Sequence, residues 1–479
     1  MTESRTYDVV VLGAGAVGEN AADRAGRSGL SVVIVEAELV GGECSYWACM
    51  PSKALLRPGA VLAAARDVPG AVQAVTGSLD RSAVLARRDS FASQWDDASQ
   101  VAWLEGVGID LVRGRARFTA PRTVEVTAED GPLTLVARHA VVVATGSEPV
   151  LPDVPGLVES APWTSREATA VQDLPDSLVV LGGGVVGVEM ATAYTDLGCR
   201  VTLLVRGDRL LTGAEPFAGQ AVAEALTGLG VDVRYGVEVT RVVRDDHGVR
   251  VEATGPDGPS WSVLADELLV ATGRRPATGD LGLDVLGLAP GSALAVDDAL
   301  QVTAVPDAWL FAVGDVTGRT ATTHQGKYDA RVVGDVVAAR FGGARPVDEV
   351  AWGRYRASAD HEAVPQVVFT RPEVAWVGLT ADAARRAGYP VRTVEVALRS
   401  AAGAALAGDS VDGTLHAVVD AEREVLLGVT FVGPDVAEML HAATIAVVGQ
   451  VPLTRLWHAV PAYPTTSEVW LRLLEAYGL

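Results

Sequence analysis

One glycine pattern occurs twice in this chain, and it limits the fold more than any other feature. The segment YDVVVLGAGAVGENAADRAG places Gly13, Gly15 and Gly18 between an apolar, β-branched run and a helix of small residues. This spacing lets backbone N–H groups approach a pyrophosphate at the helix N-terminus. The next apolar run ends in Glu36, 18 residues after Gly18, where a carboxylate can accept hydrogen bonds from a ribose diol. The segment is therefore predicted to be a dinucleotide-binding fold.

The same pattern returns 169 residues later, in SLVVLGGGVVGVEMATAYTDLGCRVTLLVR. Its glycines are Gly182, Gly184 and Gly187. Two further echoes, VVVATG and LLVATG, end in Thr145-Gly146 and Thr272-Gly273. Two nucleotide folds in one chain imply two dinucleotides, one held tightly and one exchanging.

The order of segments predicts an α/β protein with two Rossmann-like dinucleotide-binding domains and a C-terminal α+β domain. WLFAVGDVTG, with Gly314-Asp315, follows the second fold and suggests that the chain returns to complete the first domain. The expected boundaries are 1–151 and 280–350 for the discontinuous first domain, with a helical excursion at 51–110; 152–279 for the second domain; and 351–479 for the last, which carries short alternating strands and no glycine fingerprint.

Composition excludes several classes of protein. A length of 479 residues suggests about three domains. A net charge of −21 would repel phosphate backbones, so nucleic acid is not an expected partner. Apolar stretches are interrupted by Gly well short of the ~20 residues that span a bilayer. The chain begins MTESRTYDVVVLGAG, without a charged and then apolar leader, so we expect a cytoplasmic protein without membrane association.

The densest motif is GGECSYWACMPSKALL, which contains Cys44 and Cys49. A metal half-site would need further Cys or His nearby, and none lies within 80 residues. Two unrelated thiols and a redox disulfide remain. Residues five apart in a regular helix have Cα atoms ~8–9 Å apart, too far for a disulfide, so a bond requires irregular backbone with the helix beginning near Pro51. Cys49 would then precede a helix N-terminus, which favours its thiolate.

Two side-chain types stand out for their scarcity. Cys199 opens an apolar run and is expected to be a small buried hydrophobe. Of the 39 basic residues, only Lys53 and Lys327 are lysine. Because arginine is the default cation here, a retained lysine indicates a position that only an ammonium fits.

In their order and over nearly the whole length, these motifs resemble the class I flavoprotein pyridine nucleotide-disulfide oxidoreductases, the group of dihydrolipoamide dehydrogenase, glutathione reductase and mercuric reductase. GGECSYWACMPSK resembles the redox-disulfide motif of that family, AVGDVTG its late FAD motif, and VPQVVFTRPEVAWVGLT the start of its dimer-interface domain. The resemblance implies FAD and a nicotinamide as cofactors, a homodimer, and no metal.

The resemblance also assigns roles. Cys49 matches the flavin-proximal, charge-transfer thiol, and Cys44 the interchange thiol that meets the substrate. Lys53 matches the lysine near the flavin N5, with Glu189 as its counter-charge. The FAD-binding positions would be Gly13, Gly15, Gly18, Glu36, Gly42, Thr145, Gly146, Gly314 and Asp315, of which Asp315 should bond the ribityl chain. The nicotinamide positions would be Gly182, Gly184, Gly187, Arg206 and Gly273.

The second strand of the second fold indicates which nicotinamide is used. It ends in VTLLVRGDRLL, where an acid would select NAD and Arg206 stands instead, with Arg209 nearby. Arginine suits a 2′-phosphate. Gly187, the glycine at the third position of the fingerprint, mildly favours NADH instead. We expect NADPH in preference to NADH.

The chain departs from the family near its C-terminus. The family carries a His-Pro-Thr segment with a Glu five residues after the His, an acid–base pair that acts on the other subunit's dithiol. Here Tyr463 and Glu468 take these positions, and a tyrosine with a pKa of ~10 is a poor base near neutral pH. His458 is a possible substitute. Mercuric reductase also has tyrosine there but adds a C-terminal cysteine pair, and this chain ends LLEAYGL, so mercury reduction is not expected.

Two functions follow from this reasoning. The first is an FAD-dependent NAD(P)H oxidoreductase that passes electrons through a Cys44–Cys49 disulfide to a small disulfide or dithiol. The alternative is an NAD(P)H:quinone or other electron-acceptor reductase on the same scaffold, because Tyr463 replaces the histidine. Tyr46 and Trp47 beside Cys44 would narrow the pocket or offer a stacking face, which suits a planar acceptor.

Overall fold

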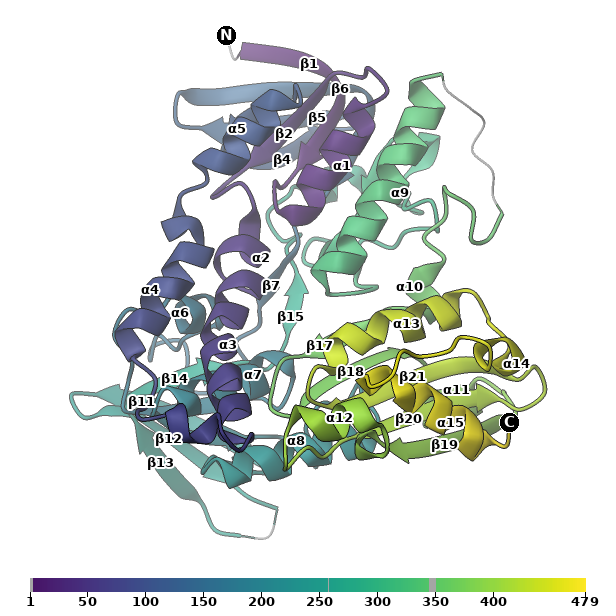
Figure 1. Ribbon diagram of the computed structural model, residues 1–479. Coiled ribbons are helices and arrows are strands. Elements are labelled where there is room, and N and C mark those ends of the chain that lie inside the picture. Colours follow the sequence, from purple (N-terminus) through teal and green to yellow (C-terminus); the bar gives the residue numbers. More distant parts are fainter. Residues whose placement is uncertain (1–2, 257, 344–349) are drawn as a thin grey trace. The chain divides into compact units, whose positions relative to one another are not determined.

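The computed structural model describes residues 3–256, 258–343 and 350–479 (Figure 1). Residue 257 of the predicted second domain, and 344–349 near the predicted end of the first, lie outside the described residues. The chain divides into two compact units. The first consists of Met1–Pro51, Asp89–Val150 and Arg274–His361; the second consists of Ser52–Arg88, Leu151–Gly273 and Glu362–Leu479.

A seven-stranded sheet organises the described part of the first unit, in the order β3-β2-β1-β6-β5-β4, with β16 also paired to β6. The pairs β1–β2, β2–β3, β1–β6 and β16–β6 are parallel, and β4 and β5 form an antiparallel extension. The strands are β1 Glu3–Leu12, β2 Val32–Glu36, β3 Asp110–Arg113, β4 Arg115–Ala120, β5 Thr123–Ala128, β6 Gly131–Val143 and β16 Leu310–Ala312. Since β16 follows the second nucleotide fold, the chain returns to this sheet after leaving it.

Two helices of the first unit, α1 (Ala16–Gly26) and α9 (Thr323–Phe341), lie side by side (Figure 1). A Cβ on Gly326 of α9 would lie 2.6 Å from Val17 Cγ2, so glycine there lets the helix backbones approach closely. The other elements are α2 Gly42–Tyr46, α5 Ala98–Gly106, α10 Ala359–Glu362, and the antiparallel pair β7 Ser147–Pro149 and β15 Arg274–Pro276.

The second unit contains the second nucleotide fold, with a parallel sheet in the order β10-β9-β8-β14 and an antiparallel sheet β11-β12-β13. Their bounds are β8 Ser177–Leu181, β9 Arg200–Leu204, β10 Asp232–Arg234, β11 Glu238–Asp245, β12 Gly248–Thr254, β13 Trp261–Ala265 and β14 Glu267–Val270. The helices of this fold are α6 Ser165–Ala170, α7 Val185–Asp196 and α8 Pro216–Gly228. Most of α3 (Cys49–Arg66) and of α4 (Arg81–Phe91) also belongs to the second unit.

The C-terminal segment of the second unit is an antiparallel sheet in the order β17-β18-β21-β20-β19. Helix α13 packs on β18 and β21, and α15 packs on β19 (Figure 1). The bounds are β17 Gln366–Val368, β18 Glu373–Gly378, α11 Ala381–Arg386, β19 Val391–Ala397, α12 Ala402–Ala407, β20 Thr414–Asp420, β21 Val425–Gly433, α13 Val436–Val448, α14 Leu453–Leu456 and α15 Val469–Tyr477.

Hydrophobic packing joins this segment to the second nucleotide fold. Val368, Val374 and Val432 belong to one buried cluster with Val180 and Val188. The predicted α/β class with an α+β C-terminal part is confirmed. None of the helices in the described ranges is both long and apolar enough to cross a membrane.

Candidate active site

The two neighbouring cysteines lie on separate helices. Cys44 belongs to α2 and Cys49 begins α3, and the backbone leaves helical geometry at Trp47, where φ is −137°. The expected irregular backbone is therefore present. The helix begins at Cys49, however, and the prediction of a start near Pro51 was wrong by two residues. The first turn tolerates this proline because its missing N–H has no partner inside the helix.

Both cysteines are half-buried thiols. Thr323, the first residue of α9, brings its Oγ1 to 3.3 Å from Cys49 Sγ. A hydrogen bond with Cys49, followed by burial, raises the pKa of Cys44, while Thr323 and Lys327 act in the opposite direction. The two thiols are thus in contact within the first unit, at the N-terminus of α9.

Of the two aromatic residues beside Cys44, Tyr46 does not offer a stacking face. Tyr46 is fully buried and donates its hydroxyl to the carbonyl of Val40 at 3.0 Å. Burial raises the pKa of Tyr46 to about 12. Trp47 packs against it, with ring centroids 5.6 Å apart. Tyr46 therefore belongs to the interior, and the expectation that both rings serve an acceptor was wrong for this residue.

The first glycine fingerprint, Gly13, Gly15 and Gly18, forms a tight turn that we call the glycine cradle. Gly13 has φ +97°, and a Cβ there would lie 2.6 Å from the carbonyl oxygen of Ala144. A Cβ on Gly18 would lie 1.8 Å from the carbonyl oxygen of Gly13. Gly15 caps α1 without a side-chain bond, and a Cβ on Gly42 would lie 2.8 Å from Gly15 Cα. Gly13 and Gly18 therefore leave no room for a side chain, so the backbone of the turn can approach a bound pyrophosphate.

Polar groups continue from the cradle along the first unit. Glu36 ends β2, and its Oε2 accepts from the N–H of Ala14 at 2.7 Å. Ser147 Oγ donates to Asp315 Oδ2 at 2.6 Å. Thr145 Oγ1 donates to the carbonyl of Ala277 at 2.8 Å.

Two further hydroxyls near the start of α9, those of Thr320 and Thr322, are buried without a hydrogen-bond partner in the described structure. Orphaned buried hydroxyls call for a ligand or water. Together with the glycine cradle and Asp315, they fit a bound FAD.

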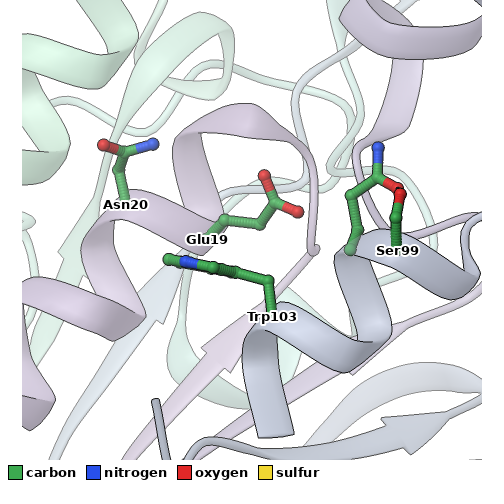
Figure 2. Close-up of a pocket in the computed structure, with 5 residues that line it drawn as sticks. Glu19, Asn20, Ser99 and Trp103 are labelled. Atoms are coloured by element: carbon green, nitrogen blue, oxygen red, sulfur yellow. The ribbon is translucent and has the colours of Figure 1, made fainter. Parts of the chain in front are cut away.

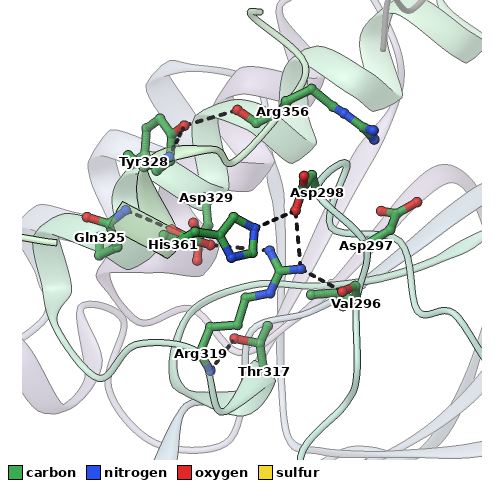
Figure 3. A network of polar contacts seen from close by, with 12 residues as sticks. Val296, Asp297, Asp298, Thr317, Arg319, Gln325, Tyr328, Asp329, Arg356 and His361 are labelled. Carbon is green, nitrogen blue, oxygen red and sulfur yellow. Dashed lines mark hydrogen bonds and ion pairs between the residues drawn. The ribbon is translucent and has the colours of Figure 1, made fainter. Parts of the chain in front are cut away.

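A polar network that sequence reasoning missed lies next to the turn that carries Gly314 and Asp315, and Figure 3 shows its members Arg319, Asp329 and His361. Buried Asp329 accepts from the N–H of Gly314 at 3.4 Å, and Arg319 lies 3.4 Å from Asp360. Burial, with the neighbouring carboxylate of Asp360, raises the pKa of Asp329 to about 8. The only sequence signal was an aspartate on the buried face of a helix.

A cavity of about 210 Å³ lies between α1 and α5 (Figure 2). Its lining residues are Glu19, Asn20, Ser99, Gln100 and Trp103. Glu19 Oε1 is buried and has no hydrogen-bond partner among the described residues. Burial raises the pKa of Glu19 to about 7, although Lys327 lowers it. Sequence reasoning did not single out this carboxylate.

In the second unit, Lys53 Nζ donates to Glu189 Oε2 at 2.7 Å. The Glu189 side chain is 3% exposed, and its Oε1 accepts from the N–H of Phe369 at 3.0 Å. The Phe369 ring also lies below the ammonium, 5.0 Å from Nζ. Both carboxylate oxygens are therefore satisfied, as a buried charge requires.

The second glycine fingerprint has the same tight turn as the first. A Cβ on Gly182 (φ +117°) would lie 2.3 Å from the carbonyl oxygen of Ala271, and one on Gly187 would lie 1.9 Å from that of Gly182. Gly184 caps α7 with open space around it, and Gly273 (φ +146°) is likewise open. Arg206 is exposed after the end of β9.

Tyr463 and Glu468, the two residues at the positions of the family's acid–base pair, differ in exposure. Tyr463 is 77% exposed, whereas Glu468 is 7% exposed, and the Oε2 of Glu468 has no hydrogen-bond partner among the described residues. His458 is exposed. Elsewhere, Cys199 is buried, as expected. No cluster of three or more His, Cys, Asp or Glu in the described parts of the chain could hold a metal.

Comparison with known proteins identifies the family. Residues 7–330 match the pyridine nucleotide-disulphide oxidoreductases, and residues 364–473 match the dimerisation domain of that family. The chain is 30% identical to mercuric reductase of Staphylococcus aureus, covering 96% of this chain and 81% of that protein. It is 32% identical to dihydrolipoyl dehydrogenase of Halobacterium salinarum, covering 98% and 95%.

Solved structures agree with these sequence relatives. The HOCl-induced flavoprotein disulfide reductase RclA from Escherichia coli superimposes with a TM-score of 0.82 at 25% identity, covering 98% of this chain and 99% of that one. LpdA from Mycobacterium tuberculosis has the same fold, with a TM-score of 0.82 at 24% identity and full coverage of both chains (100%). The chain therefore belongs to the pyridine nucleotide-disulfide oxidoreductases, a family of FAD-dependent enzymes that use NAD(P)H.

Proposed function

We propose that the chain, as a homodimer, passes electrons from NADPH through FAD to Cys44 and Cys49 and on to a small disulfide. The contact between the two thiols carries this proposal. They lie together at the N-terminus of α9, in the unit that also holds the glycine cradle and Asp315. A dithiol placed this way can be oxidised to a disulfide and reduced again.

The residues of this chain divide the work as follows. When bound, FAD supplies two-electron transfer between the nicotinamide and the thiols. Cys49 begins α3, where the helix N-terminus stabilises its thiolate. Thr323 holds a hydroxyl against that sulfur. Lys53, fixed by Glu189, provides positive charge for the reduced flavin.

The C-terminal segment supports the dimer. It matches the family's dimerisation domain and exposes large apolar side chains, among them Ile445 at 57% and Val460 at 85%. Apolar exposure of this kind indicates a surface that a partner covers.

The thiol assignment is tested by absorption spectra of the anaerobic holoenzyme. On reduction with NADPH, the wild type is expected to gain a long-wavelength band from a thiolate beside the oxidised flavin. Cys49→Ser should abolish the band, and Cys44→Ser should show it without reductant. Spectra of both variants that match the wild type would mean that the cysteines take no part.

A second candidate function, reduction of a quinone directly from the flavin, is favoured by the C-terminal pair. Tyr463 is exposed and Glu468 has a partnerless oxygen, so the segment lacks the positioned base that a dithiol needs. Electron transfer to a quinone needs no thiol proton relay.

Tyr463→His separates the two functions, because a positioned acid–base contributes ~10²–10⁴-fold to proton transfer. Lipoamide-linked turnover should rise at least tenfold in the variant, while turnover of a benzoquinone should stay within about twofold. Brisk lipoamide turnover by the wild type, with no gain from histidine, would show that another group such as His458 supplies the proton. The quinone candidate would then lose its support.

A further inference from the structure

Lys327 is a lysine that the proposed chemistry does not use. It is one of two lysines in a chain whose other cations are arginines. It lies half-buried on α9 and makes no hydrogen bond or ion pair with any residue that the structure describes. A partly buried ammonium without a partner costs free energy, so its retention requires another reason.

The geometry of α9 directs this residue toward the thiols. Thr323 contacts Cys49, and Lys327 follows four residues later, one turn along the same helix face. Gly326, the preceding residue, is packed against Val17 of α1, which fixes the rotation of α9 about its axis. The spacing therefore places Lys327 on the side of α9 that carries Thr323, the residue that contacts Cys49.

Electrostatics agree with this placement. The pKa of Cys44 is raised mainly by Cys49 and by burial, and the charge of Lys327 acts against this rise. It also lowers the pKa of Glu19, which lines the cavity between α1 and α5 (Figure 2). Lys327 thus lies within electrostatic range of both Cys44 and the carboxylate of that cavity.

We propose that Lys327 is a positioning residue for disulfide exchange, whose ammonium stabilises the thiolate of Cys44 within the same subunit. This inference rests on the proposed disulfide reductase function. The Cys44 thiolate attacks one sulfur of the acceptor, so a bond from Cys44 to that sulfur forms while the acceptor's S–S bond breaks and a thiolate leaves with a solvent proton. Cys49 then attacks Cys44 sulfur, which restores the Cys44–Cys49 disulfide and releases the second thiol. The two electrons come from the dithiol, which NADPH regenerates.

Lys327 of the same subunit compensates for the positive charge that Tyr463 cannot carry. A histidine at position 463 would carry positive charge during exchange, whereas a tyrosine carries none. Lys327 supplies that charge from α9.

The experiment measures the rate at which iodoacetamide alkylates Cys44 in the anaerobic, two-electron-reduced holoenzyme, from pH 5 to 10, with the modified peptide identified by mass spectrometry. Lys327→Met removes the charge with little change of volume, and Lys327→Arg keeps it. Arg340→Met is the matched control, since it removes one charge from the exposed end of the same helix.

Lys327→Met is expected to move the alkylation midpoint about one pH unit upward and to slow the reaction at pH 7 about tenfold. Lys327→Arg should restore most of the rate, and Arg340→Met should match the wild type. Lys327→Gln gives the same comparison if the methionine variant loses its flavin. A wild-type profile in the flavin-loaded Met or Gln variant would overturn the role of Lys327 and leave the proposed function intact. Failure of wild-type Cys44 to react at all would overturn both.

Discussion

The two nucleotide folds share one turn and differ in what surrounds it. The third glycines are packed alike: a Cβ on Gly18 or on Gly187 would lie 1.8 or 1.9 Å from a carbonyl oxygen of the first glycine. The middle glycines are also alike, because a Cβ on Gly15 would lie 4.0 Å from Gly42 and one on Gly184 would meet nothing within 4 Å. The strand after the first turn ends in half-buried Glu36, which accepts from the N–H of Ala14, whereas the strand after the second turn is followed by exposed Arg206.

The fingerprint thus fixes the local turn, while the residues that follow it decide how firmly a dinucleotide is held. A turn followed by a half-buried carboxylate suits a resident cofactor. A turn followed by the exposed Arg206 suits a dinucleotide that binds and leaves. Substitutions placed at equivalent points of the two folds can break this comparison.

The largest effect is expected from valine at the first glycine of each fold. Gly13 and Gly182 both have positive φ and no room for a Cβ, so either substitution stores about 1–3 kcal/mol of strain or more. Gly13→Val should yield protein without flavin and with a lowered melting temperature. Gly182→Val should keep its flavin while the KM for NADPH rises at least about tenfold.

Flavin content, measured by absorbance, tests the prediction for Gly13→Val, and the KM for NADPH tests the prediction for Gly182→Val. Loss of flavin from the Gly182 variant, or its retention by the Gly13 variant, would contradict the distinction between resident and exchanging sites.

An intermediate effect is expected from Arg206→Glu. A charge-assisted hydrogen bond contributes about 1.5–3 kcal/mol, so kcat/KM for NADPH should fall about 10–100-fold. NADH lacks the 2′-phosphate and serves as the internal control, with a change within about threefold. An unaltered NADPH/NADH ratio would show that this arginine does not read the phosphate.

The smallest effect is expected from Asp329→Asn, which concerns the first fold alone. The pKa of Asp329 is raised to about 8 by burial, so the folded protein keeps a proton that the unfolded chain releases near pH 4. This group therefore makes stability fall as pH rises from about 4 to about 8. Asparagine stays neutral, and the melting temperature of the variant should decline a few degrees less across that window.

Thermal melts of the holoenzyme at a series of pH values provide the measurement, and the KM for NADPH should not change. A slope as steep as that of the wild type would assign the pH dependence to other groups.

Local rules explain why the sequence predicted so much of this fold. The glycine spacing, the β-branched runs and Glu36 act within one βα unit, so they specify the two nucleotide folds without distant contacts. The cysteine spacing required irregular backbone for the same reason, and only the first residue of the following helix was misplaced. Lys53 and Glu189, 136 residues apart, were paired by resemblance to the family, and the structure shows them bonded.

Other features depended on which elements pack together. No sequence rule placed Thr323 on Cys49 or Phe369 under Lys53, because each contact joins residues far apart in the chain. The contact of Asp329 with Gly314 spans only 15 residues but depends on how α9 packs against the turn that precedes it. The shared core of the second nucleotide fold and the C-terminal sheet is likewise a tertiary result. The turns, the order of the folds and the spacing of the two thiols follow from the amino-acid sequence, since they arise from local backbone geometry. The electrostatic surroundings of those thiols depend on the tertiary structure, since burial and charge at a site are set by every element that packs around it.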